Sequence, residues 1–364
     1  MFTLSPEEVV ARARGDLRIG APVAVVSGEA GAVAAAVEAL SPERLTEFRA
    51  LGRPLDLTIT RRRAETLKAR AYDGDLARLI FEPEMGLETA SAAADPALAL
   101  TRPLIGPFGA RRDGSAAPHR MALKLAKSAR LLPSVLAAPM SAEEAARQAA
   151  EAGLTLVDEA ALAAAERAAI DLRLVSAARV PLTVSEDSRV LVWRPASGEE
   201  EHYAIEIGAP DRAAPVLSRL HSACFTGDLI GSLKCDCGPQ LRAALAQIGA
   251  EGAGVLLYLN QEGRGIGLAN KMRAYFLQDE GFDTVEANHR LGFEDDERDF
   301  RIGTAILKAM GFSAVRLMTN NPGKVAAMEA AGLHVAERVP LRVGETAHNH
   351  HYLRTKAAKS GHLL

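Results

Sequence analysis

The sequence predicts an α/β protein of two domains. Three observations carry this prediction: a length of 364 residues, an aliphatic composition, and a change of pattern near residue 178. With 48% hydrophobic but only 4% aromatic residues, the chain can bury a large aliphatic core, and its length exceeds that of a typical single domain. We therefore expect one α/β domain over residues 1–178 and a second over residues 179–364.

Helix starts alternate with short aliphatic strands in residues 1–178. Ser5 and Ser141 each precede a Glu by three residues, which is the capping-box pattern, and Ser41 before a Pro is typical of a further helix start. Aliphatic runs predict strands over residues 22–26 and 55–60.

The remaining first-half features favour no site. Residues 88–100 and 107–118 are rich in Ala, Gly, Pro and charge, and we expect loops there. The run Arg61-Arg62-Arg63 could bind phosphate, but beside polar residues at a helix start a solvated face is the favoured interpretation.

From about residue 179 the pattern changes to the alternation of apolar and polar residues that is typical of strands. Helices are expected from residue 240 to 249 and from the Gly-rich turn at 261–267 through Tyr275. Strands are expected over residues 180–184, 190–193, 203–207, 216–220, 254–259 and 314–318.

All three cysteines, Cys224, Cys235 and Cys237, lie in one short window with the spacing C-x10-C-x-C. The sequence has no apolar run long enough to span a membrane and no signal peptide at its start, so we expect a cytoplasmic protein with reduced thiols and no membrane partner. Clustered thiols in that compartment indicate zinc, one ion per chain, although three buried structural thiols remain the alternative.

The number of ligands decides what such an ion does. Structural zinc sites are closed by four protein groups, whereas catalytic sites leave one position for water, whose pKa zinc lowers towards about 7. Three thiolates fit the catalytic class. His221, three residues before Cys224, is a possible fourth ligand that would make the zinc purely structural.

Two segments downstream of the cysteines are typical of phosphate sites. The turn at 261–267 holds three glycines with Glu262 and Arg264 between a strand and a helix, although a tight turn with solvated charges would look the same. At 319–324, Asn321 can cap a helix whose first turn carries Lys324. Because a net charge of −3 gives no general attraction to nucleic acid, these local sites favour a nucleotide as partner.

These residues form motifs that closely resemble GTP cyclohydrolase II, over about half of the chain and in order. They are RLHSACFTGD from Arg219, LKCDCGPQL from Leu233, NQEGRGIGL from Asn260, DTVEANH from Asp283, DERDF from Asp296, TNNP from Thr319 and the terminal SGHLL. The resemblance implies a mixed-sheet fold with helices and a homodimer. It also implies a zinc-dependent, magnesium-requiring hydrolase of cyclic amidine C–N bonds. That enzyme converts GTP to 2,5-diamino-6-ribosylamino-pyrimidinone 5'-phosphate, formate and pyrophosphate, the first step of riboflavin biosynthesis.

The resemblance also implies residue roles. Cys224, Cys235 and Cys237 match the zinc ligands, Tyr275 the catalytic tyrosine, Asp296 the proton acceptor, and Arg298 an arginine that acts either as nucleophile towards the α-phosphorus or as a phosphate clamp. Ala223 stands where the family commonly has Glu. The expected GTP contacts are Arg219, Leu220, His221, Ser222, Ala223, Gln240, Glu262, Gly263, Arg264, Thr284, Thr319 and Lys324.

The first half is similar to a dihydroxybutanone phosphate synthase domain, on RIGAPVAVV from Arg18, LSPE from Leu40 and GRPL from Gly52. Its loop at 27–31 holds one carboxylate, Glu29, where that family binds magnesium through several, and a hard cation needs several oxygen ligands. We therefore expect a degenerate, non-catalytic domain, and a chain beginning near Arg179 to open GTP alone. The alternatives are a bifunctional enzyme with an active synthase and a non-catalytic GTP- or zinc-binding paralogue.

Overall fold

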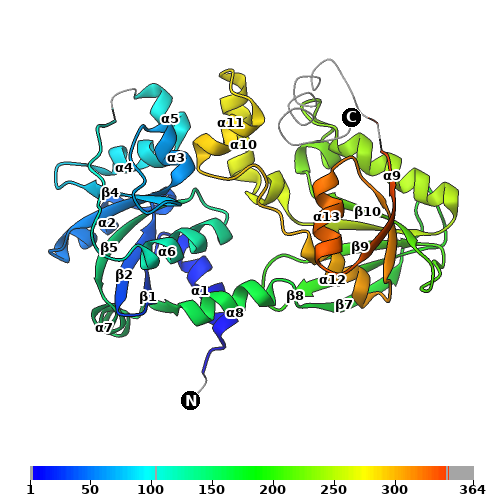
Figure 1. Cartoon of the computed structure of the whole chain (residues 1–364), viewed down its shortest axis with the longest axis horizontal. Coiled ribbons are helices and arrows are strands. Elements are labelled where there is room, and N and C mark those ends of the chain that lie inside the picture. The colour runs from blue at the N-terminus through cyan, green and yellow to red at the C-terminus, as the bar shows by residue number, and fades with distance from the viewer. Residues whose placement is uncertain (1–2, 103–104, 342, 344–364) are drawn as a thin grey trace. The chain divides into compact units, whose positions relative to one another are not determined.

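The computed structural model describes residues 3–102, 105–341 and 343, and these form two compact units (Figure 1). The first comprises Met1–Glu166 and Ala269–Glu297, and the second Arg167–Leu268 and Arg298–Leu364. Each unit is built on its own sheet, so the predicted two-part α/β class is confirmed. The domain boundary near residue 178 stays a prediction, and the terminal SGHLL motif lies outside the described residues.

The first unit contains a six-stranded sheet in the order β4-β3-β5-β2-β1-β6. Only the β1–β6 pair is parallel among the five neighbouring pairs of these strands. The strands are β1 (Val23–Ser27), β2 (Ala30–Ala36), β3 (Leu55–Thr60), β4 (Leu76–Phe81), β5 (Ser134–Ser141) and β6 (Thr155–Asp158).

Helices of the first unit begin where the sequence predicts caps. The side chains of Ser5, Ser41 and Ser141 each accept a hydrogen bond from the first turn, with full capping boxes at Ser5 and Ser141. The helices are α1 (Pro6–Arg18), η1 (Val37–Ala39), α2 (Pro42–Ala50), α3 (Arg61–Thr66), α4 (Leu87–Ala94), α5 (Pro96–Thr101), α6 (Ala117–Ser128), α7 (Ala142–Ala152), α8 (Glu159–Ala168), α10 (Leu268–Asp279) and α11 (Thr284–Leu291).

The second unit contains a seven-stranded mixed sheet in the order β13-β12-β10-β11-β9-β8-β7. The four strands β13, β12, β10 and β11 are parallel, whereas β9, β8 and β7 continue the sheet antiparallel. The strands are β7 (Leu172–Arg179), β8 (Ser188–Pro195), β9 (His202–Ile207), β10 (Val216–Ser222), β11 (Gly254–Leu259), β12 (Ala314–Met318) and β13 (His334–Val339).

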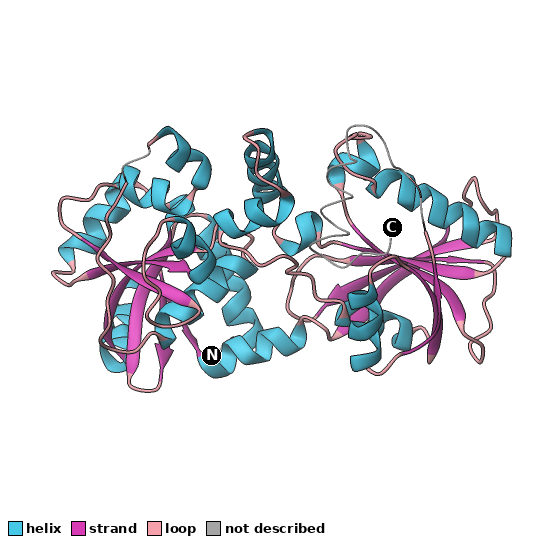
Figure 2. Cartoon of the chain, turned by 45° about the horizontal axis from the view of Figure 1, so that its top comes forward, coloured by secondary structure: helices cyan, strands magenta, loops and turns pink. Residues whose placement is uncertain are grey.

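Helices cover both faces of this sheet (Figure 2). On one face, Leu217 and Leu256 pack with the helix Cys237–Glu251. On the other face, Leu220 and Leu257 pack with the helices Arg301–Ala309 and Pro322–Ala330. Residues an odd number of positions apart on a strand point to opposite faces, as this packing requires. The helices are η2 (Phe225–Leu229), a short π-helical turn, α9 (Cys237–Glu251), η3 (Glu262–Gly265), α12 (Arg301–Ala309) and α13 (Pro322–Ala330). Every helix in the described ranges is too short or too polar to cross a lipid bilayer.

Three local predictions are wrong. Residues 88–100 are largely helical, in α4 and α5, because alanine is the strongest helix former and Asp95 caps the second helix. The strand expected at 180–184 lies earlier, as β7 over Leu172–Arg179. Arg63, expected on a solvated face, is buried with 2% of its surface exposed.

Candidate active site

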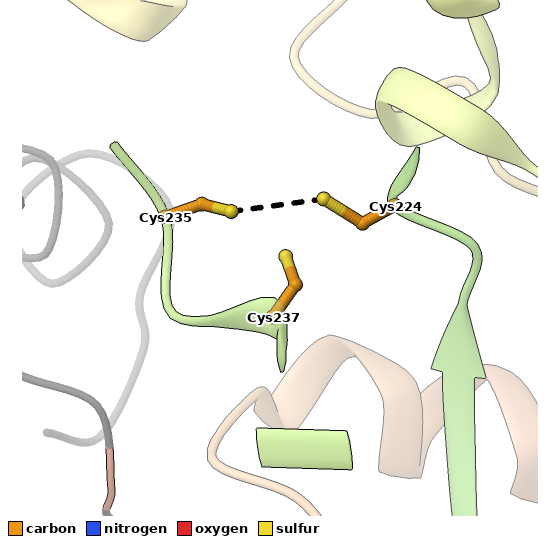
Figure 3. A group of neighbouring side chains, drawn as sticks. All are labelled: Cys224, Cys235 and Cys237. Carbon is orange, nitrogen blue, oxygen red and sulfur yellow. Dashed lines mark hydrogen bonds between the residues drawn. The ribbon is translucent and has the colours of Figure 1, made fainter. Parts of the chain in front are cut away.

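The three thiols converge, as Figure 3 shows. Cys224 follows the end of β10, Cys235 lies in the loop after η2, and Cys237 is the first residue of α9. All three sulfurs lie within 4.8 Å of one another, and those of Cys224 and Cys235 are 3.6 Å apart. Zinc–sulfur bonds of about 2.3 Å at tetrahedral angles place two sulfurs about 3.8 Å apart, so the thiols fit a zinc ion.

Gly227 in η2 makes this convergence possible. A Cβ atom at that position would lie 2.7 Å from the Cys235 sulfur and 3.1 Å from the Cys224 sulfur. The Gly227 amide donates a hydrogen bond to the Cys224 sulfur over 3.3 Å. A main-chain amide that donates to the sulfur stabilises the thiolate, which is the form that binds metal.

The thiols also affect one another's ionisation. Hydrogen bonding with Cys224 is the largest cause that raises the pKa of Cys235. Hydrogen bonds with Cys224 and Cys235, followed by burial, raise the pKa of Cys237 well above its usual value. Three neighbouring thiolates repel, and a bound cation stabilises all three together.

His221 belongs to a hydrogen-bonded network beside the thiols, not to the ligand group itself. Its Nε2 lies 3.0 Å from Asp228, and its ring stacks on Tyr258 with the centroids 5.6 Å apart. The Tyr258 hydroxyl donates to Asp228, which also accepts from the Cys224 amide. Burial lowers the pKa of His221, so its ring is neutral at pH 7. The group that could hold a metal ion thus consists of the three cysteines without His221.

Cationic side chains gather at the carboxyl ends of the parallel strands. Arg219 in β10 donates to the carbonyl of Met318 at the end of β12 over 2.9 Å. Lys324 in α13 donates to the carbonyl of Leu220 over 2.9 Å. Burial lowers the pKa of Arg219 to about 10, so the guanidinium stays charged at pH 7, and its buried Nε has no hydrogen-bond partner. This edge of a sheet is where ligands bind in α/β folds.

Arg298 lies at the same edge. Its Nη1 donates to the Ser222 hydroxyl over 3.2 Å, and its guanidinium carbon lies 4.9 Å from the Phe300 ring centroid. The Lys324 ammonium lies 5.3 Å from the same ring. Phe300 therefore faces two cations, and cation–π attraction stabilises the positions of both.

The Gly-rich turn is η3, where Gly263 and Arg264 both have left-handed backbones, with φ of 63° and 62°. For Arg264 this conformation is strained, and strain of this kind is common at binding sites. Glu262 accepts hydrogen bonds from the amides of Phe225 and Gly263, over 2.6 and 2.9 Å. The turn is thus tied to η2 and to the cysteine loop.

Two further predicted contacts lie in the second unit. Gln240 bridges Arg219 and Asp236, with distances of 2.6 Å and 2.5 Å. The Thr319 hydroxyl accepts from the Asn321 amide over 3.0 Å and is buried beside the start of α13. Asn321 caps that helix as predicted.

Three predicted residues lie elsewhere. Tyr275, Thr284 and Asp296 belong to the segment Ala269–Glu297 of the first unit. Tyr275 in α10 has the Lys271 ammonium 5.6 Å from its ring centroid, and Thr284 is the first residue of α11. Their participation in one site with the thiols stays a prediction.

Asp228, Tyr258 and Phe300 are structural partners that the sequence interpretation missed. Asp228 and Phe300 lie inside the recognised motifs, RLHSACFTGD and DERDF, so both could have been found as neighbours of the predicted site residues. Tyr258 could be found only from the register, because it pairs with His221 across β10 and β11.

Comparisons with known proteins agree with this geometry. A family model described as GTP cyclohydrolase II matches residues 173–340. A protein named GTP cyclohydrolase-2 from Azospirillum brasilense is 44% identical over 98% of this chain and 94% of its own length. A protein with the same name from Azotobacter vinelandii is 62% identical over 45% of this chain and 79% of its own length. Another from Salmonella typhimurium is 52% identical over 54% of this chain and 99% of its own length.

Among solved structures, a two-domain 3,4-dihydroxy-2-butanone 4-phosphate synthase from A. baumannii aligns over 91% of this chain and 99% of its own, with 15% identity and a TM-score of 0.33. The Azospirillum relative aligns along both halves of the chain at 44% identity, and the family model covers all three cysteines. The chain therefore belongs to the GTP cyclohydrolase II family of enzymes.

Proposed function

We propose that this chain is a zinc- and magnesium-dependent enzyme of riboflavin biosynthesis. It converts GTP to 2,5-diamino-6-ribosylamino-pyrimidinone 5'-phosphate, formate and pyrophosphate. The observation that carries the proposal is the convergence of three thiols beside Arg219, Lys324 and Arg298 at one edge of the second sheet. The proposed metal ligands and the proposed phosphate-binding cations belong to the same unit of the fold.

Cys224, Cys235 and Cys237 would hold the zinc ion. When bound, zinc supplies the Lewis acidity that makes water a nucleophile at neutral pH, here towards C8 of the guanine ring. Gly227 and Asp228 hold the Cys224 loop through the hydrogen bonds described above. These contacts fix the orientation of the thiols before substrate arrives.

The cations of the site would bind the triphosphate, which carries magnesium. Arg219 and Lys324 donate hydrogen bonds to main-chain carbonyls, and these bonds orient both cations at the edge of the sheet. Arg298, held by Ser222 and Phe300, would act on the α-phosphate either as nucleophile or as clamp. Because a guanidinium loses its proton only with difficulty, the clamp is the simpler role.

Tyr275 and Asp296 would move protons, Tyr275 to the opening imidazole ring and Asp296 as acceptor. Further GTP contacts would come from Gln240, Thr284, Thr319 and the turn residues Glu262, Gly263 and Arg264. Cytoplasmic location and a homodimer complete the proposal, on the resemblance to the family.

The test is incubation of the protein with GTP and magnesium, with formate and pyrophosphate assayed together. Both products should appear in equal amounts. Phosphate or pyrophosphate without formate would indicate simple nucleotide hydrolysis and refute ring opening, and GTP binding without turnover would favour a non-catalytic paralogue.

A further inference from the structure

The segment Ala269–Glu297 lies in sequence within the GTP cyclohydrolase motifs but belongs structurally to the first unit. It carries all of α11 and nearly all of α10. It also carries Tyr275, Thr284 and Asp296, the three residues that the proposed reaction draws from outside the second unit. The contacts that hold this segment therefore bear on catalysis.

Arg63 forms the most buried of these contacts. Its guanidinium donates to the carbonyls of Ala92 and Ala93 at the end of α4, over 2.9 and 2.8 Å, and to the carbonyl of Arg290 near the end of α11, over 3.3 Å. The last carbonyls of a helix lack helical partners and carry its negative dipole end. One buried cation thus satisfies the carboxyl ends of two helices and joins α11 to α4.

Thr60 holds the residue that ends α11. Its hydroxyl donates to the carbonyl of Gly292 over 2.8 Å. Gly292 has a φ of 90°, and a Cβ atom there would lie 2.8 Å from the Thr60 hydroxyl and 2.9 Å from Pro133. Glycine is required at this position by both conformation and close approach.

Polar contacts continue along the segment on either side of α11. Arg273 in α10 donates to Glu38 and Asp95 over 2.9 and 3.0 Å. Lys127 in α6 pairs with Glu297 over 2.6 Å. These pairs are partly buried, so each holds its geometry better than a surface pair does.

We propose that the first half of the chain is a positioning support for the catalytic segment, and that Arg63 and Thr60 are its positioning residues. By fixing the carboxyl-terminal end of α11, they set the backbone of the helix that begins at Thr284 and leads to Asp296. The catalytic roles of those residues rest on the proposed function, whereas the anchoring of α11 rests only on the contacts of Arg63 and Thr60.

Two variants of the full-length, zinc-loaded protein test this, each with a matched control. Thr60→Val removes the hydrogen bond to Gly292 and the cap that the same hydroxyl gives to α3, the helix that carries Arg63. Its control is Thr58→Val, on the same strand, because the buried Thr58 hydroxyl has no hydrogen-bond partner. Arg63→Lys removes the fork that joins α4 to α11. Its control is Arg78→Lys, since Arg78 is equally buried but binds Asp73, Asp113 and Gly114, outside the segment.

We expect the Thr60 and Arg63 variants to release formate about tenfold or more slowly than their controls, because small misplacements of catalytic groups are costly. Zinc per chain should be unchanged, and amide hydrogen exchange over residues 284–294 should be faster than in the controls. If the formate rate and the amide exchange of the variants equalled those of their controls, the proposal would be overturned. If Arg63→Lys did not fold, the comparison of Thr60→Val with Thr58→Val would decide in the same way. A wild-type protein that binds zinc but makes no formate would instead refute the proposed function, and the exchange measurement would still decide the anchoring.

Discussion

At the scale of single residues, the site combines cations that are held by neutral groups. Arg219 and Lys324 are both buried and are both oriented by main-chain carbonyls. Taking a charge out of water has a free-energy cost, and the lowered pKa of Arg219 expresses that cost. A polyphosphate anion would offset it, which is why these residues favour a nucleotide over a neutral substrate.

Arg298→Lys should reduce the rate of formate and pyrophosphate release by about a hundredfold while the fold is kept. The charge remains, but the planar fork that meets Ser222 and phosphate is lost. The matched control is Arg301→Lys, an exposed arginine that pairs with Asp299, which should retain wild-type rates. Equal activity in both variants would remove Arg298 from the mechanism.

Tyr275→Phe removes one hydroxyl and should slow formate release by about 10²-fold, the usual weight of one positioned acid or base. Zinc content and GTP affinity should stay at their wild-type values. If single-turnover measurements gave the wild-type formate rate, Tyr275 would be a packing residue of α10 only.

At the scale of elements, short turns position the ligands. The π-helical turn η2 brings Gly227 against the Cys224 and Cys235 sulfurs, and η3 holds Glu262 against the amide of Phe225. Neither element has enough residues to be stable alone, so each depends on the loop contacts. The thiol geometry is therefore sensitive to changes that leave the ligands untouched.

Gly227→Ala should lower zinc affinity by at least about tenfold, because its Cβ would meet two ligand sulfurs and a chelator would then remove the ion more easily. Gly15→Ala is the control, since a Cβ at Gly15 in α1 meets no atom within 4 Å. Competition with a zinc chelator measures both. Equal zinc affinity in the two variants would show that the thiols can move aside freely.

Local signals explain which predictions succeeded. The caps at Ser5, Ser41 and Ser141 and the three-cysteine group depend on nearby residues, and all were predictable. The burial of Arg63 was not, because its acceptors are carbonyls of residues 29, 30 and 227 positions away. Contacts between residues so far apart in the sequence produce no local pattern of apolar and polar residues from which they could be predicted. The same holds for Tyr258, whose partner Asp228 lies 30 residues away.

At the scale of the whole molecule, the chain divides into two units whose sequences interleave. The Salmonella relative matches this chain over 99% of its own length but over only 54% of this chain, so a large part of this chain has no counterpart in it. The expectation that residues from Arg179 onward work alone stays untested. The anchoring of segment 269–297 predicts instead a lower turnover number for such a shortened chain.

The first unit should make no dihydroxybutanone phosphate from ribulose 5-phosphate. Its loop at residues 27–31 holds a single carboxylate, Glu29. A magnesium site would need several oxygen ligands beside Glu29. Synthase activity in the intact protein that disappears in Glu29→Gln would make the enzyme bifunctional and overturn this prediction.

The most direct test of the central claim measures bound zinc and formate release together, for the wild-type protein and for Cys235→Ser, with GTP and magnesium present. The account predicts about one zinc per wild-type chain, with loss of both zinc and formate in the variant. Chelation should abolish wild-type formate release, and added zinc should restore it in the wild type alone. Full-rate formate release from metal-free protein, or from Cys235→Ser without zinc, would contradict the account.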